Sequence, residues 1–310
     1  MEIYLFRHQE WQAQYNCGYH TEEFWLVEGK VNQPLGYWYM ISGIIYMIPY
    51  IPCLLVDAEP GALQELLLQN HVLPGSYRLF HSRINAVLTG FLTIQGAVTC
   101  TYPNLIYVAG CVGMSLWCMA CLTCVILAFN RCVDLWEQKL MWHLFNGYKT
   151  YLWLSAPVFY FLYFLLFTTP YMNPSHSINN ITVVIVLPML YVFLCCSLCY
   201  KARSAQSANV STIQKQILIQ ACSICAFNLI ASIIYVVMQF VETNVVFVVI
   251  GQLTWQASHG GAAIVYLTLN HTIRKRVIQL LSGAHWKGSR VHTDNSHLHH
   301  DRHSHHNFVI

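Results

Sequence analysis

The chain has 310 residues, of which 56% are hydrophobic and 9% charged, and its formal net charge is +3. A soluble domain carries roughly 25% charged residues, so a soluble fold of this composition would leave too much apolar surface in water. A lipid solvent removes the conflict, and the composition therefore indicates an integral membrane protein. Residues 1–36 contain seven charged side chains and no apolar stretch typical of a signal peptide. We therefore expect the first hydrophobic segment to stay in the membrane.

Seven hydrophobic segments approach the roughly 20 apolar residues that a helix needs to cross a bilayer. We predict transmembrane helices at residues 36–56, 84–98, 104–129, 150–169, 181–200, 217–240 and 245–269. The second segment is short, and extending it toward the N-terminus brings in Arg78, His81 and Arg83. Prolines inside the first, fourth and fifth segments bend helices in lipid, and bent helices open crevices that suit ligand pockets and transporters.

The basic residues divide unevenly between the two sides of these segments. If the N-terminus lies outside, 14 of the 16 Lys and Arg residues fall on the cytoplasmic side, and only Arg7 and Lys30 fall outside. Cytoplasmic connections of membrane proteins are enriched in Lys and Arg. We therefore predict an extracellular N-terminus, a cytoplasmic C-terminus and an odd number of spans.

Thirteen cysteines invite a metal or redox interpretation. Cys118, Cys121 and Cys124 recur every three residues in the third predicted span, but small buried thiols also let helices pack closely, which we favour. The eight histidines after residue 284 can bind a metal weakly, and here we favour a solvated, disordered tail. We expect no metal site and no cofactor.

Cys17 and Cys100 lie on the outer, oxidising side of the predicted topology. The loop at 170–180 has no cysteine, so a disulfide between that loop and the top of the third span is excluded. We hypothesise a Cys17–Cys100 disulfide that ties the N-terminal segment over the bundle, with two free thiols as the alternative.

Polar side chains inside the membrane are costly, so they indicate a functional site or hydrogen bonds between helices. Gln252, Trp255 and His259 are spaced by three and four residues and share one face of the last predicted span. Trp117 lies midway along the third span, and Asn228 lies inside the sixth. We take these five residues as candidates for a ligand pocket open to the outside. Interhelical hydrogen bonding is the alternative, which we favour for Asn228 and His259.

Asn130-Arg131-Cys132 follows the third predicted span where it meets the cytoplasm. Positive-inside placement alone explains an Arg that ends a helix at the interface. A polar residue followed by Arg also suits a switch that contacts another helix in one state and a partner protein in another. The candidate coupling surface joins this triplet to basic residues at neighbouring helix ends, namely Lys201, Arg203, Lys215 and Arg274.

Motifs of enzyme chemistry are missing from the sequence. It has no HExxH, GxSxG or Walker pattern, and none of its 13 acidic residues lies in the middle of a predicted span. We therefore predict no catalytic residue. Proton-coupled pumps and intramembrane aspartyl proteases, which need buried carboxylates, are disfavoured.

Several short motifs together resemble one receptor family. They are Tyr15-Asn16-Cys17, Leu88-Thr89-Gly90, Ile106-Tyr107-x-x-Gly110, Ile126-Leu127-Ala128-Phe129-Asn130-Arg131-Cys132, Trp255-Gln256-x-x-His259-Gly260 and Tyr266-Leu267-x-x-Asn270-x-Thr272-Ile273-Arg274. On these residues the chain resembles the nematode serpentine receptors and is most similar to class T, over nearly its whole length.

The resemblance implies an all-α, rhodopsin-like bundle of seven transmembrane helices, and in this chain the second helix is shortened. The predicted spans divide the chain into an extracellular segment at 1–35, the bundle at 36–269 and a His-rich cytoplasmic tail at 285–310, and the resemblance implies an amphipathic eighth helix at 270–284. The His-rich tail is not a feature associated with the family. The implied function is a chemosensory G-protein-coupled receptor at the plasma membrane, including that of sensory cilia. Its partners would be a small-molecule ligand, a heterotrimeric G protein and the lipid bilayer, with no nucleic acid.

The second span departs from the family pattern, because Leu88 follows Tyr77-Arg78 too closely for a full helix between them. A mis-assigned exon, a splice variant, a decaying gene and a short tilted helix all account for this. A non-signalling, degenerate receptor is therefore the main alternative function. A transporter or channel is a weaker alternative, since the chain has no visible internal repeat and few polar groups at mid-span.

Overall fold

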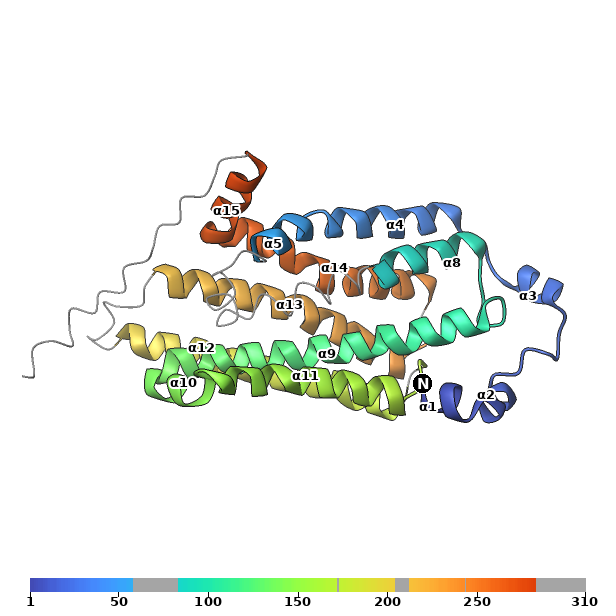
Figure 1. Cartoon of the computed structure of the whole chain (residues 1–310), viewed down its shortest axis with the longest axis horizontal. Coiled ribbons are helices and arrows are strands. Elements are labelled where there is room, and N and C mark those ends of the chain that lie inside the picture. The colour runs from blue at the N-terminus through green and yellow to red at the C-terminus, as the bar shows by residue number, and fades with distance from the viewer. Residues whose placement is uncertain (58–82, 172, 204–211, 243, 283–310) are drawn as a thin grey trace, which may run out of the picture.

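The computed structural model describes residues 1–57, 83–171, 173–203, 212–242 and 244–282, and within them the chain is helical without a strand. Figure 1 shows an elongated bundle whose long helices run along its long axis. The short helices α1 (Glu2–Phe6), α2 (His8–Gln14) and α3 (Glu22–Glu28) lie at one end, which we call the N-terminal end. Helices α10 (Gln138–Phe145) and α15 (His271–Leu281) lie at the other end, which we call the opposite end.

The first predicted span consists of two helices. Helix α4 covers Gln33–Met47 and α5 covers Tyr50–Asp57, so the continuous helix predicted at 36–56 is corrected at its centre. Pro49 lies at the break between them. Proline has no N–H to donate, and its ring clashes with the carbonyl one turn earlier, so the helical hydrogen bonding is interrupted there.

The second predicted span is represented by a π-helical segment, η1 (Arg83–Leu88), and by α8 (Thr89–Gln95). Gly96 ends α8 with a φ of 64°, which glycine adopts at no steric cost, and this stops the helix before the predicted end at residue 98. At 1.5 Å per residue, η1 and α8 extend about 20 Å, less than the roughly 30 Å of a bilayer core. The predicted extension through Arg78 and His81 lies outside the described residues.

Small residues hold this short segment closely against α4. A Cβ atom added at Gly36 would lie 2.7 Å from the Gly90 carbonyl oxygen, and one added at Gly43 would lie 2.0 Å from the Ala86 Cβ atom. Residues without bulky side chains allow helix backbones to approach in lipid, where dispersion contacts drive association. The first and second spans therefore pack as a pair.

Helix α9 (Pro103–Trp136) is the longest helix of the described chain, with 34 residues. The sequence contains neither Gly nor Pro between Gly113 and Gly147, so nothing interrupts helical hydrogen bonding at the predicted end, residue 129. Arg131 therefore lies within the helix, and the interpretation that Arg131 ends it is wrong. At about 51 Å, α9 exceeds the bilayer core and must tilt or project from it.

Helix α11 covers Tyr148–Phe167, and α12 covers Pro174–Arg203 and begins seven residues before the predicted start at residue 181. The Asn173 side-chain oxygen accepts a hydrogen bond from the His176 backbone N–H (2.9 Å), and Pro174 starts the helix. The polar run at 174–180, predicted as an outer loop, thus forms a helical turn whose polar face points into the bundle. His176, Asn179 and Asn180 are at most 5% exposed.

Helices α13 (Thr212–Phe240) and α14 (Val245–Leu269) complete the bundle, and α14 has the predicted bounds. The Asn244 side chain caps α14 by accepting from the Phe247 N–H (3.0 Å). Asn270 separates α14 from α15 and caps α15 in the same way, by accepting from the Ile273 N–H (3.0 Å). The predicted tail at 285–310 lies outside the described residues.

Helix α9 lies at the centre of the packing, in contact with α11, α12 and α13, while α14 packs against α13 and α4. By length and composition, four helical segments of the described chain can cross a membrane: α9, α11, Pro174–Ser197 and Leu218–Phe240. The other predicted spans differ for identifiable reasons. Pro49 divides the first, the second is short, and α14 carries Gln252, Gln256 and His259 among its apolar residues.

Candidate functional site

A cavity of about 290 Å³ opens near the N-terminal end of the bundle, between α9, α12, α13 and α14. This volume lies at the lower edge of the roughly 300–1,000 Å³ typical of ligand pockets. Most of its lining is apolar or aromatic. The lining residues are Gly110, Met114, Trp117, Pro170, His176, Tyr235 and Trp255.

Three aromatic rings form one wall of the cavity. The Trp117 and Tyr235 ring centroids are 6.0 Å apart, and the Tyr235 and Trp255 centroids are 6.3 Å apart at an interplanar angle of 84°. The Tyr235–Trp255 pair is edge-to-face, which is favourable because the positive edge of one ring meets the negative face of the other, while the Trp117–Tyr235 pair is tilted. The rings come from α9, α13 and α14, so the wall depends on how these three helices pack.

A chain of polar groups lies beside the cavity and joins four helices. The Trp117 indole N–H donates to the Asn180 side-chain oxygen (2.8 Å), and the Asn180 amide nitrogen lies 3.3 Å from the His176 Nε2. The His176 Nδ1 faces the Gln239 side chain of α13 at 3.5 Å. On the other side, the Tyr160 hydroxyl of α11 donates to Asn179 (3.2 Å), which donates to Asn180 (3.1 Å). We call Trp117, Asn179, Asn180, His176, Gln239 and Tyr160 the polar relay.

The structure brings two of the five predicted pocket residues, Trp117 and Trp255, to the cavity. Gln252 instead donates to the Asn85 carbonyl (2.8 Å) and side-chain oxygen (2.5 Å), which ties α14 to the second span. Asn228 is fully buried and donates to the Ile224 carbonyl of its own helix (3.1 Å).

His259 is fully buried deeper in the bundle. Its ring meets the Trp117 ring edge-on with centroids 6.0 Å apart, and its backbone carbonyl accepts from the Tyr50 hydroxyl. His259 therefore lies behind the cavity wall, while Gln252 bonds the second span and Asn228 bonds a carbonyl of its own helix.

Sequence reasoning missed His176 and Tyr235. His176 was assigned to a loop because its neighbours are polar. Tyr235 lies four residues before Gln239 and seven after Asn228, so a helical plot of α13 places all three on one face. That spacing was the available signal for Tyr235.

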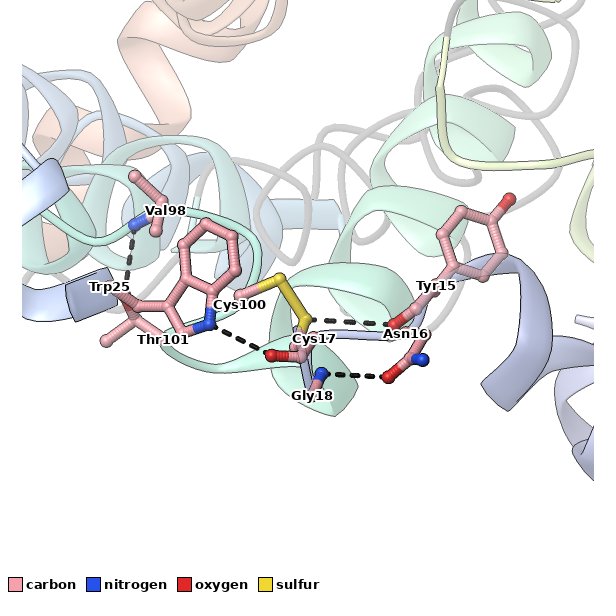
Figure 2. Close-up of a disulfide and its surroundings, with 8 residues drawn as sticks. All are labelled: Tyr15, Asn16, Cys17, Gly18, Trp25, Val98, Cys100 and Thr101. Carbon is pink, nitrogen blue, oxygen red and sulfur yellow. Dashed lines mark hydrogen bonds between the residues drawn. A yellow bond between two sulfur atoms is a disulfide. The ribbon is translucent and has the colours of Figure 1, made fainter. Parts of the chain in front are cut away.

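Cys17 and Cys100 form a disulfide at the N-terminal end, with their Cα atoms 5.5 Å apart (Figure 2). The Trp25 indole N–H donates to the Cys17 carbonyl (3.1 Å), and the Val98 N–H donates to the Thr101 hydroxyl (3.2 Å). The disulfide holds the segment before α4 against the loop that leads into α9, and each hydrogen bond orders one of these two segments.

The N-terminal segment also packs on the bundle through aromatic rings. Trp11 is 6% exposed and meets the Tyr107 ring of α9 edge-on, at 5.6 Å between centroids. Tyr15 stacks on Tyr171, with centroids 5.5 Å apart. Burial, together with the nearby Tyr171 and Cys111, raises the pKa of the Tyr15 hydroxyl, so Tyr15 is neutral here. Tyr171 follows the lining residue Pro170, so this aromatic cluster lies next to the cavity.

At the opposite end of α9, Arg131 is 8% exposed, and its guanidinium lies 3.9 Å from the Asp134 carboxylate. The Asn130 amide approaches the Met141 sulfur of α10 (3.5 Å), and the Cys132 thiol approaches the Leu190 carbonyl of α12 (3.4 Å). The triplet therefore faces neighbouring helices in this conformation.

The other predicted coupling residues are basic and lie near helix ends. The Arg274 guanidinium donates to the Thr268 carbonyl (2.6 Å). Lys201 and Arg203 belong to α12 and Lys215 to α13, and their side chains lie outside the described residues.

The cysteines of α9 lie in helix contacts. Cys118, Cys121 and Cys124 are at most 1% exposed, and the Cys225 thiol of α13 lies 3.6 Å from the Cys124 carbonyl. Among the residues that the structure describes, no group of three or more His, Cys, Asp and Glu side chains could hold a metal ion.

Comparison with solved structures identifies the fold. The chain is similar to the crystal structure of squid rhodopsin with a TM-score of 0.55 and 13% identity, over 86% of this chain and 91% of that chain. The fold thus defines a seven-helix membrane protein of the rhodopsin type.

Comparison with protein families identifies the family. The chain belongs to the family described as serpentine type 7TM GPCR chemoreceptor Srt, whose model matches residues 1–172 and 169–289. It is 27% identical over 293 residues to serpentine receptor class T-55 of Caenorhabditis elegans, covering 87% of this chain and 80% of that relative. The resemblance to class T is confirmed, and the chain is a multi-pass membrane protein of a receptor family.

Proposed function

We propose that this chain is a chemosensory G-protein-coupled receptor that binds a small molecule in the cavity and signals to a heterotrimeric G protein. We place residues 1–35 outside the cell and residues 270–310 in the cytoplasm, at the plasma membrane and that of sensory cilia. The positive-inside rule supports this orientation, since Arg7 and Lys30 are the only basic residues predicted on the outer side. The disulfide supports it too, because disulfides persist in oxidising compartments.

The main support for the proposal is that α9 contributes residues both to the cavity and to the opposite end of the bundle. Trp117 of α9 lines the cavity, and Arg131 lies 14 residues further, about 21 Å along the same helix. A ligand that favours one packing of α9 against its neighbours changes the surroundings of Arg131 without touching it. The size of the change is limited by the ligand's difference in affinity between the two packings.

Arg131 suits the role of the switched group because it is a buried cation with one close acidic neighbour, Asp134. A buried charge is costly unless it is paired, so a small displacement of α12 or α13 favours its release toward water. We propose that the released side chain, with Asn130 and Cys132 beside it, meets the G protein. The neighbouring basic residues Lys201, Arg203, Lys215 and Arg274 complete this surface.

The proposal is tested with the full chain in a heterologous cell that carries a G-protein reporter, over a broad panel of small molecules. We expect a ligand-dependent response that Arg131→Ala lowers at least about tenfold while the amount of receptor at the surface stays constant. Lys275→Ala, which removes an exposed cation of α15, is the matched control and should respond like the native chain. Equal responses from Arg131→Ala and the native chain contradict the proposal.

The short second span favours one rival, a receptor that binds a ligand without signalling. This rival predicts a chain that reaches the surface and binds a small molecule, while the reporter stays silent with every G protein supplied. A transporter or channel would instead produce flux in liposomes. The membrane-spanning parts of α11, α12, α13 and α14 contain no Asp, Glu, Lys or Arg, which disfavours a charged path.

A further inference from the structure

The cavity carries no charged group. None of its lining residues is Asp, Glu, Lys or Arg, and the nearest charges along α9 are Arg131 and Asp134 at the opposite end. An ion that entered would lose its hydration without gaining a counter-ion, which is unfavourable in a low-dielectric site. The lining therefore selects against both anions and ordinary ammonium ions.

The hydrogen-bonding capacity of Trp117 and His176 is already used by the polar relay. An indole N–H only donates, so the Asn180 oxygen must face Trp117, and the Asn180 amide nitrogen must then face His176. The His176 Nε2 therefore accepts from Asn180, and the Gln239 amide nitrogen lies 3.5 Å from the His176 Nδ1. Neither side chain has a ring nitrogen left for a ligand.

Tyr235 is different from these two residues. Its ring lies between Trp117 and Trp255, and its hydroxyl has no hydrogen-bond partner within the described ranges. A phenolic hydroxyl both donates and accepts, so it can meet an alcohol, a carbonyl or an ether. The flanking rings offer faces and edges to a flat, apolar body.

We propose that the cavity selects a small, uncharged, aromatic molecule with one polar group, and that the Tyr235 hydroxyl hydrogen-bonds this group. The inference rests on the proposed receptor function and names the ligand class of the same site. The cavity volume of about 290 Å³ lies at the lower edge of the range for ligand pockets, which favours a small ligand. Tyr235 is then the residue that distinguishes an aromatic alcohol from the bare hydrocarbon.

The test uses the full chain purified in detergent and four probes that share a phenyl ring with one attached carbon. Benzyl alcohol and toluene are neutral, while benzylamine is a cation and benzoate an anion at pH 7. Binding is followed by saturation-transfer NMR and by the thermal midpoint. We expect benzyl alcohol to bind at least about tenfold more tightly than either ion.

A conservative variant tests the role of Tyr235. Tyr235→Phe should weaken benzyl alcohol about five- to tenfold and leave toluene unchanged, since one hydrogen bond is lost and the ring remains. Tyr163→Phe, a half-exposed tyrosine of α11 outside the cavity, is the matched control and should change neither.

Three results overturn the inference. They are tighter binding of benzylamine or benzoate, equal effects of Tyr235→Phe and Tyr163→Phe, and no binding of any probe at about 10 mM. Phenyltrimethylammonium tests cation–π attraction by the three rings, and its binding above benzyl alcohol also contradicts the inference. A reporter response to some other molecule would then leave the receptor function standing. Probe binding as expected, with a reporter that stays silent to every compound, would contradict the receptor function alone.

Discussion

Asn180 is the centre of the polar relay, and its replacement by alanine should destabilise the bundle. Its side chain makes three hydrogen bonds, to Trp117, Asn179 and His176, at 2.8, 3.1 and 3.3 Å. Side-chain hydrogen bonds inside membrane proteins contribute about 0.6 kcal/mol on average and about 1.7 kcal/mol at most. Asn180→Ala should therefore lower the free energy of unfolding by about 2 to 5 kcal/mol.

The measurement is thermal unfolding of the purified chain, followed by the fluorescence of the buried tryptophans. Asn180 also begins an Asn-Ile-Thr glycosylation pattern, so a lost glycan could produce the same result. Thr182→Ala is the matched control, because it removes the pattern at an exposed position and leaves the relay intact. We expect Thr182→Ala to be neutral, since Asn180 is fully buried in the folded chain.

Two outcomes would refute this reasoning. If Thr182→Ala lowers the thermal midpoint as much as Asn180→Ala does, the effect belongs to a glycan. If Asn180→Ala unfolds like the native chain, the three hydrogen bonds do not contribute to stability, and the polar relay has no structural role.

Two further predictions concern contacts between separate segments of the chain, the Cys17–Cys100 disulfide and the Gln252–Asn85 hydrogen bonds. Cys17→Ser should lower the thermal midpoint, and dithiothreitol should do the same to the native chain but not to the variant. The bond closes a separation of 83 residues, for which chain entropy sets an upper limit of about 4.5 kcal/mol, less if the spans stay inserted. Gln252→Leu should cost about 1 to 2 kcal/mol by removing the donor to Asn85, measured by chemical or thermal unfolding. Thr254→Val should be nearly neutral, since within the described part of the chain the Thr254 hydroxyl bonds only carbonyls of its own helix. Equal losses from these two variants would contradict the assignment.

The helices whose ends carry local signals could be predicted from the sequence. The bounds of α14 were predicted from its apolar run, and the Asn244 cap directly before that run is a local signal that agrees with them. The break at Pro49 could also have been predicted, since proline interrupts helical hydrogen bonding inside a helix. The longer α9 could also have been expected from the lack of Gly and Pro around Arg131.

The start of α12 could not be predicted in this way. Its first turns are polar, and polar runs between apolar segments usually form loops. Here the polar face is stabilised by Trp117 and Gln239, each at least 60 residues away along the chain. No local pattern contains such partners, so the helix exists because of the tertiary contacts.

In the candidate site, too, some residues could be predicted from local sequence and others depend on tertiary contacts. Trp117 and Trp255 were predicted as pocket residues from their depth and spacing, and the structure places both at the cavity. Gln252, an equally polar neighbour of Trp255, contacts the second span instead. Spacing fixes which residues share a helix face, but the partner of that face depends on how the helices pack.

The sequence by itself determined that this protein resides in a membrane and that it belongs to a seven-helix receptor family, and it predicts that the basic residues are concentrated on one side. These properties follow from composition, from local periodicity and from motifs, which need no knowledge of contacts. Only the tertiary structure decided that His176 and Tyr235 line a cavity, that the Arg131 side chain of α9 is buried in the bundle, and that Cys17 lies beside Cys100. Each of these depends on residues far apart in the chain that meet only when the bundle is packed.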